Sequence, residues 1–157
     1  MIITISNHNI PIMKMKIFIA VPVSLFFSIL VFAQKDSLIL NCPMNDAIMR
    51  NQKGDYKFNA PDMLVVIVSK TDTAARACIS GKVSSVVRNT EGSYDVVMFY
   101  KKYNMWYSGI TKPLVIKGAM VKAGQPLGLV PPGNELEFLL YKEDTPVNPR
   151  EFLLCKQ

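Results

Sequence analysis

The chain has 157 residues, of which 50% are apolar and 19% are charged, and its formal net charge is +6. So high an apolar fraction excludes a disordered polymer, and the length suits a single domain. The one histidine, His8, lies close to the N-terminus. If that region is removed, no imidazole remains to serve as a general base, a proton shuttle or a metal ligand.

Residues 1–33 have the pattern of a secretory signal peptide. Two lysines precede an apolar run, 17–33, which carries no charge and ends in Val-Phe-Ala. A basic region, an apolar region and a small residue at the cleavage site make up such a signal, so we expect cleavage after Ala33. An uncleaved membrane anchor is the alternative, but a short run interrupted by Pro22 falls below the ~20 residues that cross a bilayer. The mature chain, 34–157, is therefore expected in the periplasm or outside the cell, with no stable membrane span.

The mature chain keeps 16 basic and 12 acidic residues, which gives a net charge of +4. This mild excess would suit an anionic polymer of the cell envelope, but it does not indicate a nucleic-acid partner. The stretch 98–107 mixes aromatic residues with lysines, as surfaces that stack on single-stranded nucleic acids do. Because export makes nucleic acid a poor partner, we interpret this stretch as a β-hairpin, with sugar stacking as a minor alternative.

Three cysteines remain in the mature chain: Cys42, Cys78 and Cys155. In an oxidising compartment an odd number indicates one disulfide and one free thiol. The sequence does not choose among the three pairings. We favour Cys42–Cys78, because Cys155 lies in a C-terminal tail that is expected to fray. No CxxC spacing is present, so neither a thiolate zinc site nor a thioredoxin motif is indicated.

Beyond the leader, the segment 34–61 is polar and is broken by Pro43, Gly54 and Pro61. We expect an irregular N-terminal arm here, with at most a short strand at 38–40.

Six strand-length apolar runs follow, separated by turn residues: 63–68, 81–87, 94–100, 105–107, 126–130 and 135–141. None has the 3.6-residue period of a long helix. Only the end is typical of a helix, because Asn148 suits an N-cap and Pro149 suits the first helical position. The pattern predicts an all-β sandwich over about 62–154 with a short C-terminal helix, followed by a tail, 155–157.

Five motifs in this region resemble those of the M23 (LytM-type) zinc endopeptidases: Ile79–Val83, Tyr107–Ile110, Gly118–Gly128, Glu135–Phe138 and Thr145–Pro149. The most specific part is Gly118–Gly128, followed closely by the strand that contains Leu-Glu-Phe. The resemblance implies a duplicated hybrid-motif β-sandwich and a role at bacterial peptidoglycan.

The chemistry of the family does not carry over. The resemblance places its three zinc ligands at Asp62, Val66 and Glu137, and its two catalytic histidines at Gly109 and Glu135. None of the five positions keeps its functional residue. A catalytic zinc site needs three protein ligands and an open water position, and valine offers no lone pair. We therefore expect a degenerate peptidase-like domain with no zinc, no other cofactor and no endopeptidase activity.

Two functional hypotheses from different classes remain for such a domain. The first is a binding or regulatory module of the cell envelope, whose partner is peptidoglycan or an envelope protein such as a cell-wall hydrolase. The second is a hydrolase that acts on cell-wall glycan or peptide bonds through Glu135 and Glu137 without zinc. A calcium or magnesium site at Asp62, Glu135 and Glu137 is not favoured, because calcium requires six or more oxygen ligands, and we interpret the two glutamates as solvated carboxylates. We favour the binding module, because an acid–base pair needs carboxylates in opposed environments.

Overall fold

The computed structural model describes residues 38–51 and 63–156, which belong to one compact unit, Asp36–Gln157. Almost all regular structure in these residues is β-strand, so the prediction of an all-β fold is confirmed. The predicted signal peptide and Asp62 lie outside the described residues. Among the residues that are described, no helix is long and apolar enough to span a membrane.

The larger sheet is antiparallel, and seven of its strands follow one another in space. In spatial order they are β2 (Ile48–Asn51), β3 (Leu64–Val68), β11 (Glu135–Lys142), β7 (Tyr103–Ile110), β6 (Tyr94–Tyr100), β5 (Gly81–Arg88) and β9 (Met120–Val121). A further strand, β12 (Thr145–Val147), pairs with the second half of β11. The pairing of β6 with β7 confirms the hairpin interpretation of residues 98–107.

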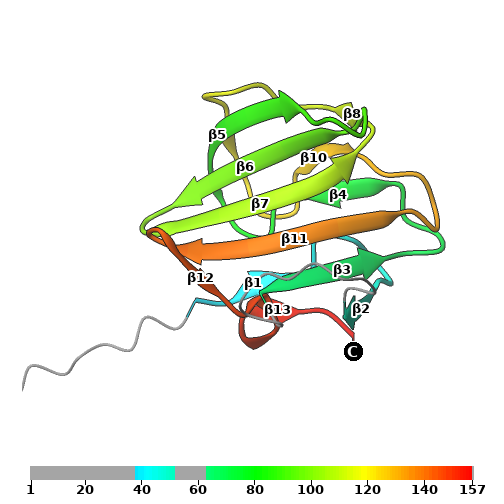
Figure 1. Cartoon of the computed structure of the whole chain (residues 1–157), viewed down its shortest axis with the longest axis horizontal. Helices are drawn as coiled ribbons and strands as arrows, with labels where there is room; N and C mark the ends of the chain where they lie inside the picture. Colours follow the sequence, from blue (N-terminus) through cyan, green and yellow to red (C-terminus); the bar gives the residue numbers. More distant parts are fainter. Residues whose placement is uncertain (1–37, 52–62, 157) are drawn as a thin grey trace, which may run out of the picture. The chain divides into compact units, whose positions relative to one another are not determined.

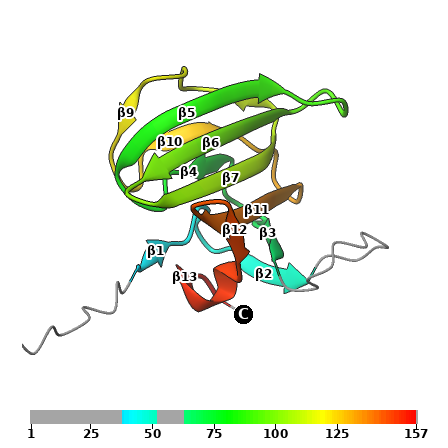
Figure 2. The same cartoon turned by 60° about the vertical axis from the view of Figure 1, so that its left-hand side comes forward.

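A smaller sheet lies behind the larger one in both views (Figures 1 and 2). Its strands are β4 (Ala74–Arg76), β10 (Pro126–Leu129) and β8 (Lys112–Pro113), in the order β4-β10-β8. Apolar side chains of the two sheets form the core between them. Tyr107 and Phe138 meet there edge to face, with ring centroids 5.1 Å apart, which is a favourable aromatic geometry.

The central strands alternate between the core and the opposite, outer face of the larger sheet. In β11 the side chains of Leu136, Phe138 and Leu140 are buried in the core, whereas Glu135 and Glu137 lie on the outer face between them. This period of two follows from the pleat of a β-strand. The alternation therefore places both glutamate carboxyl groups of β11 on the outer face.

The two ends of the compact unit are joined. Strand β1 (Leu40–Asn41) pairs in parallel with β13 (Leu153–Leu154), and a disulfide links Cys42 to Cys155 with a Cα–Cα distance of 4.8 Å. The preference for Cys42–Cys78 is therefore wrong. The C-terminal tail does not fray, because β13 and a bond from Met49 N–H to the Lys156 carbonyl hold it. Cys78 is a free, buried thiol.

Two local predictions differ from the structure in detail. The predicted irregular arm contains β1 and β2, and β2 extends the larger sheet by pairing with β3. The predicted C-terminal helix is a single 3₁₀ turn, η1 (Pro149–Glu151). Its N-cap is Asn148 as expected, and the Asn148 side-chain oxygen accepts a hydrogen bond from the backbone N–H of Arg150 at 3.1 Å.

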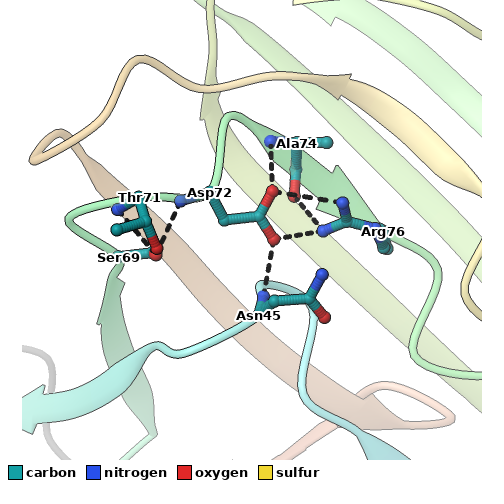
Figure 3. Close-up of polar contacts among 6 residues, drawn as sticks. All are labelled: Asn45, Ser69, Thr71, Asp72, Ala74 and Arg76. Carbon is teal, nitrogen blue, oxygen red and sulfur yellow. Dashed lines mark hydrogen bonds and ion pairs between the residues drawn. The ribbon is translucent and has the colours of Figure 1, made fainter.

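A buried carboxylate fastens the β1–β2 connection to the sandwich (Figure 3). Asp72, in the loop after β3, accepts hydrogen bonds from the backbone N–H groups of Asn45 and Ala74 and from the guanidinium of Arg76. The hydroxyl of Ser69 accepts from Asp72 N–H in turn, at 3.0 Å. Burial alone would raise the pKa of Asp72, but its bonds to Arg76 and the backbone outweigh that effect and lower it.

Candidate functional site

A pocket of about 270 Å³ is lined by residues of the outer face of the larger sheet, where β5 and β7 finish and β11 begins. These strand ends lie at the same end of the sheet (Figure 1). One wall is the turn between β5 and β6, at residues 89–91. The other lining residues are Ser108 and Gly109 of β7, and Glu135 and Glu137 of β11. The family pattern predicted four catalytic or metal-binding positions among the described residues. Three of them line this pocket: Gly109, Glu135 and Glu137.

Strand register explains how the fourth position, Val66, joins them. Glu137 pairs with Val66 of β3 on one side and with Ser108 of β7 on the other. Residues paired in this way lie on the same face, with neighbouring Cβ atoms ~5 Å apart. Val66 is only 3% exposed, does not line the pocket, and offers the neighbouring Glu137 carboxyl no polar group. Asp62, the fifth position predicted from the family pattern, lies outside the described residues.

Gly109 has a structural reason to be glycine. Its φ angle is +93°, which residues with side chains rarely adopt. A Cβ atom added there would lie 2.6 Å from the Glu135 carbonyl oxygen, well inside van der Waals contact. The backbone of β7 therefore approaches β11 too closely at this point for any side chain. A histidine could not simply be restored at this position.

A hydrogen-bond network holds the turn at 89–91 against β7. Asp95 accepts hydrogen bonds from the Ser108 hydroxyl at 2.7 Å and from the Asn89 side-chain amide at 3.1 Å. The Asn89 side-chain oxygen accepts from the backbone N–H groups of Glu91 and Ser93, at 3.2 and 3.0 Å. The pocket wall is thus built by side chains whose positions are fixed by one another.

Sequence reasoning missed this part of the site. The stretch 89–92 is a predictable turn, but nothing in the sequence placed it beside Glu137 of a distant strand. The contact between Asp95 and Ser108 could not be predicted from the sequence either. The two residues lie on different strands of a hairpin, and only its register brings them together.

The pocket is electrostatically negative. Glu137 is half-buried, and its pKa is raised mainly by that burial and then by the charges of Glu91, Glu135 and Asp95. Among the residues that the structure describes, no positively charged side chain lines the pocket. A group that carries a positive charge would relieve the repulsion among these carboxylates, whereas an anion would be repelled.

The residues present do not fit the zinc ion that the fold would suggest. Within residues 38–51 and 63–156, no three histidine, cysteine or acidic side chains are arranged to hold a metal ion. Val66 provides no ligand atom, and Gly109 leaves no room for a side chain. The arrangement is thus one that can bind and orient a polar group in a negative pocket.

Comparison with known proteins places the fold. The sequence matches no protein-family model and no curated protein. Csd3 of Helicobacter pylori is similar in structure, with a TM-score of 0.60 and 20% identity over 76% of this chain. The catalytic domain of lysostaphin from Staphylococcus simulans gives 0.54 and 21% over 68%, and covers 91% of that chain. A chain of the SpoIIQ–SpoIIIAH pore-forming complex gives 0.57 and 15% over 74%, with 92% of that chain covered.

These similarities define the class of fold: a LytM-like, M23-type β-sandwich. The present chain spans about a third of Csd3, which is 34% covered, so the other parts of that protein have no counterpart in the comparison. The neighbours include both a peptidase catalytic domain and a component of a pore-forming complex. The fold alone therefore does not distinguish catalysis from protein assembly, and the residues of the site carry the functional argument.

Proposed function

We propose that this protein is an exported, non-catalytic LytM-like module that binds peptidoglycan or an envelope protein such as a cell-wall hydrolase. The observation that carries the proposal is the pocket itself. It lies where the family pattern predicts the active site, yet it is lined by carboxylates, polar turn residues and a glycine, and the neighbouring Val66 offers no ligand atom. Such a lining favours recognition of a peptide segment over activation of a water molecule.

The charge of the pocket narrows the ligand. Carboxylates of Glu91, Glu135 and Glu137 surround one small cavity, and Asp95 adds a fourth negative charge. An ammonium or guanidinium group on the bound segment would pair with them in a partly dehydrated setting, where such hydrogen bonds are stronger than in water. We therefore propose that the bound segment presents a basic side chain or a free amine.

The alternative, a hydrolase that uses Glu135 and Glu137 without zinc, draws support from one observation. The raised pKa of Glu137 is the property that a general acid requires. Against it, the two carboxyls are two residues apart on one face of one strand, so they do not flank a substrate from opposite sides.

One experiment tests both. The exported protein is incubated with isolated sacculi, and bound protein and released fragments are measured for the native chain and the double variant Glu135→Gln/Glu137→Gln. The matched control is Glu143→Gln/Asp144→Asn, which removes two charges from the turn at the other end of β11. We expect binding that only the first variant weakens, and no released fragments. Turnover that disappears in the first variant would favour the hydrolase, and binding unaffected by either variant would contradict the pocket.

A further inference from the structure

A second surface of the same sheet face is rich in exposed aromatic residues. Strand register aligns one residue from each of five neighbouring strands: Met120, Lys82, Phe99, Asn104 and Tyr141. All five alternate with core residues and therefore lie on the outer face. We call these five residues, together with Trp106, the outer-face row.

Trp106 belongs to this surface because of its position on β7. It lies two residues beyond Asn104 on the same face, so it is the diagonal neighbour of Phe99 and Tyr141 on the adjacent strands. Phe99 is 43% exposed, Trp106 38% and Met120 74%, which are high values for large apolar side chains. Three aromatic residues thus neighbour Asn104 on the outer face.

The shape of the row indicates an extended ligand. Strands lie ~4.8 Å apart, so the row is about 19 Å long from Met120 to Tyr141, and Phe99 and Tyr141 are about 10 Å apart. That spacing is comparable to the length of two sugar rings. The surface is a paired sheet with no free backbone edge between β5 and β11, so it offers a peptide no strand to extend.

The chemistry of the row fits a carbohydrate. The C–H face of a pyranose ring packs on the negative face of an aromatic ring, while its hydroxyl groups remain free for hydrogen bonds. Asn104 and Lys82 supply hydrogen-bonding groups between the rings. No acidic residue belongs to the row, and none occurs in the sequence from 96 to 134. The row is thus complementary to a neutral or weakly anionic polymer, in contrast to the pocket.

We propose that the outer-face row binds a glycan strand of amino sugars, an inference that rests on the proposed function at peptidoglycan. The pocket lies on the same face, because Ser108 is four residues from Asn104 along β7, or about 13 Å. A peptide branch of four extended residues covers a similar distance. A glycan on the row could therefore place an amine of its peptide branch in the acidic pocket.

The test uses peptide-free glycan strands, released from sacculi, as the probe. Binding to the exported protein is measured for the native chain, for Phe99→Ala/Trp106→Ala and for Glu135→Gln/Glu137→Gln. We expect the aromatic variant to lose about tenfold or more in affinity, as stacked rings do elsewhere, and the acidic variant to bind normally. The matched control is Leu114→Ala/Ile116→Ala, which removes two exposed apolar side chains outside the row.

A further variant, Trp106→Phe, keeps an aromatic ring at this position. We expect it to retain most of the glycan binding, which distinguishes stacking from a loss of folding. Equal binding of glycan by the native and aromatic variants would overturn the inference. The inference would also be overturned if the aromatic variant lost binding only to anionic lipid vesicles or to a captured envelope protein. If intact peptidoglycan binds through the acidic pocket while bare glycan does not bind, this inference fails but the proposed function stands.

Discussion

Single residues determine what the site can hold, and Gly109 shows this most directly. At this position the M23 pattern has a histidine, yet here the backbone has a positive φ angle and touches β11. The local backbone therefore excludes a histidine side chain at this position, whatever the neighbouring side chains are.

Gly109→Ala should destabilise the fold by about 2–4 kcal/mol, because a strained φ angle and a clash with the Glu135 carbonyl add together. Gly133→Ala is the matched control. Its φ angle is also positive, at +81°, but a Cβ there meets nothing within 4 Å. We expect it to cost only about 1–2 kcal/mol. Denaturant unfolding measures both, and equal losses would show that the close approach of β7 and β11 is unimportant.

Glu137 supplies a prediction on pH. Its pKa is raised, so the folded protein holds this proton more tightly than the unfolded chain does. Ionisation therefore costs stability at neutral pH, and the cost disappears below about pH 4, where the carboxyl is protonated in both states. Glu137→Gln should raise the free energy of unfolding at pH 7 slightly, by less than about 1 kcal/mol because the group is half-exposed, and the melting temperature should rise accordingly. The gain should vanish at low pH, and a gain that persists there would contradict this account.

At the scale of elements, the long strands could be predicted and the short ones could not. The expected run 94–100 coincides with β6, and 135–141 differs from β11 by one residue. Each carries its own burial pattern, because alternate side chains enter the core. By contrast, β4, β8 and β9 have two or three residues, and only a distant partner strand defines them.

The candidate site divides in the same way. Val66, Gly109, Glu135 and Glu137 could be named from the family pattern, since each sits inside a recognisable motif. The wall at 89–91 and the Asp95–Ser108 bond could not, because they depend on the twist and register of a hairpin. The disulfide prediction was wrong for a related reason: the parallel pairing of β1 with β13 joins segments that are far apart in sequence.

Asp72 links the loop after β3 to the β1–β2 connection and to β4, and its replacement should lower the free energy of unfolding. Asp72→Asn loses the charge that pairs with Arg76 and one of its two acceptor oxygens, so we expect a loss of about 1–3 kcal/mol at pH 7. Because the folded-state pKa is lowered, the native contribution is complete above about pH 4 and is lost as the pH falls through that lowered pKa. The difference between variant and native protein should therefore narrow in acid.

The control for this prediction is Asp46→Asn. Asp46 lies 3.7 Å from the Lys156 ammonium, but both side chains are 76% exposed, so this ion pair should contribute little. Chemical denaturation at pH 7 and in acid compares the two variants. A loss for Asp46→Asn as large as that for Asp72→Asn would remove the special role of the buried carboxylate.

At the scale of the whole compact unit, the Cys42–Cys155 bond is the main covalent constraint, since it spans 113 residues of sequence. A cross-link of that length restricts the unfolded chain strongly, by an amount near 4–5 kcal/mol in the chain-entropy description. Cys42→Ser/Cys155→Ser should lower stability by up to about that amount. Treatment of the native protein with a reductant should reproduce the effect, and a loss under about 1 kcal/mol would contradict it.

Cys78 should take no part in this chemistry while the protein is folded. Burial raises the pKa of its thiol to about 12, so almost no thiolate exists at neutral pH. Its backbone N–H donates to the hydroxyl of Tyr107 in the core. We expect no alkylation of the native protein and one alkylated thiol per chain after unfolding without reductant, as intact mass would show.

The pairing of β1 with β13 also sets an order of events. The cysteines lie near opposite ends of the compact unit, so the ring cannot close until almost all of that unit has been delivered to an oxidising environment. A copy retained in a reducing compartment lacks the cross-link and is correspondingly easier to unfold and degrade. The stabilisation by the disulfide is thus gained after almost the whole unit has been exported, and only in the compartment where we propose that the protein works.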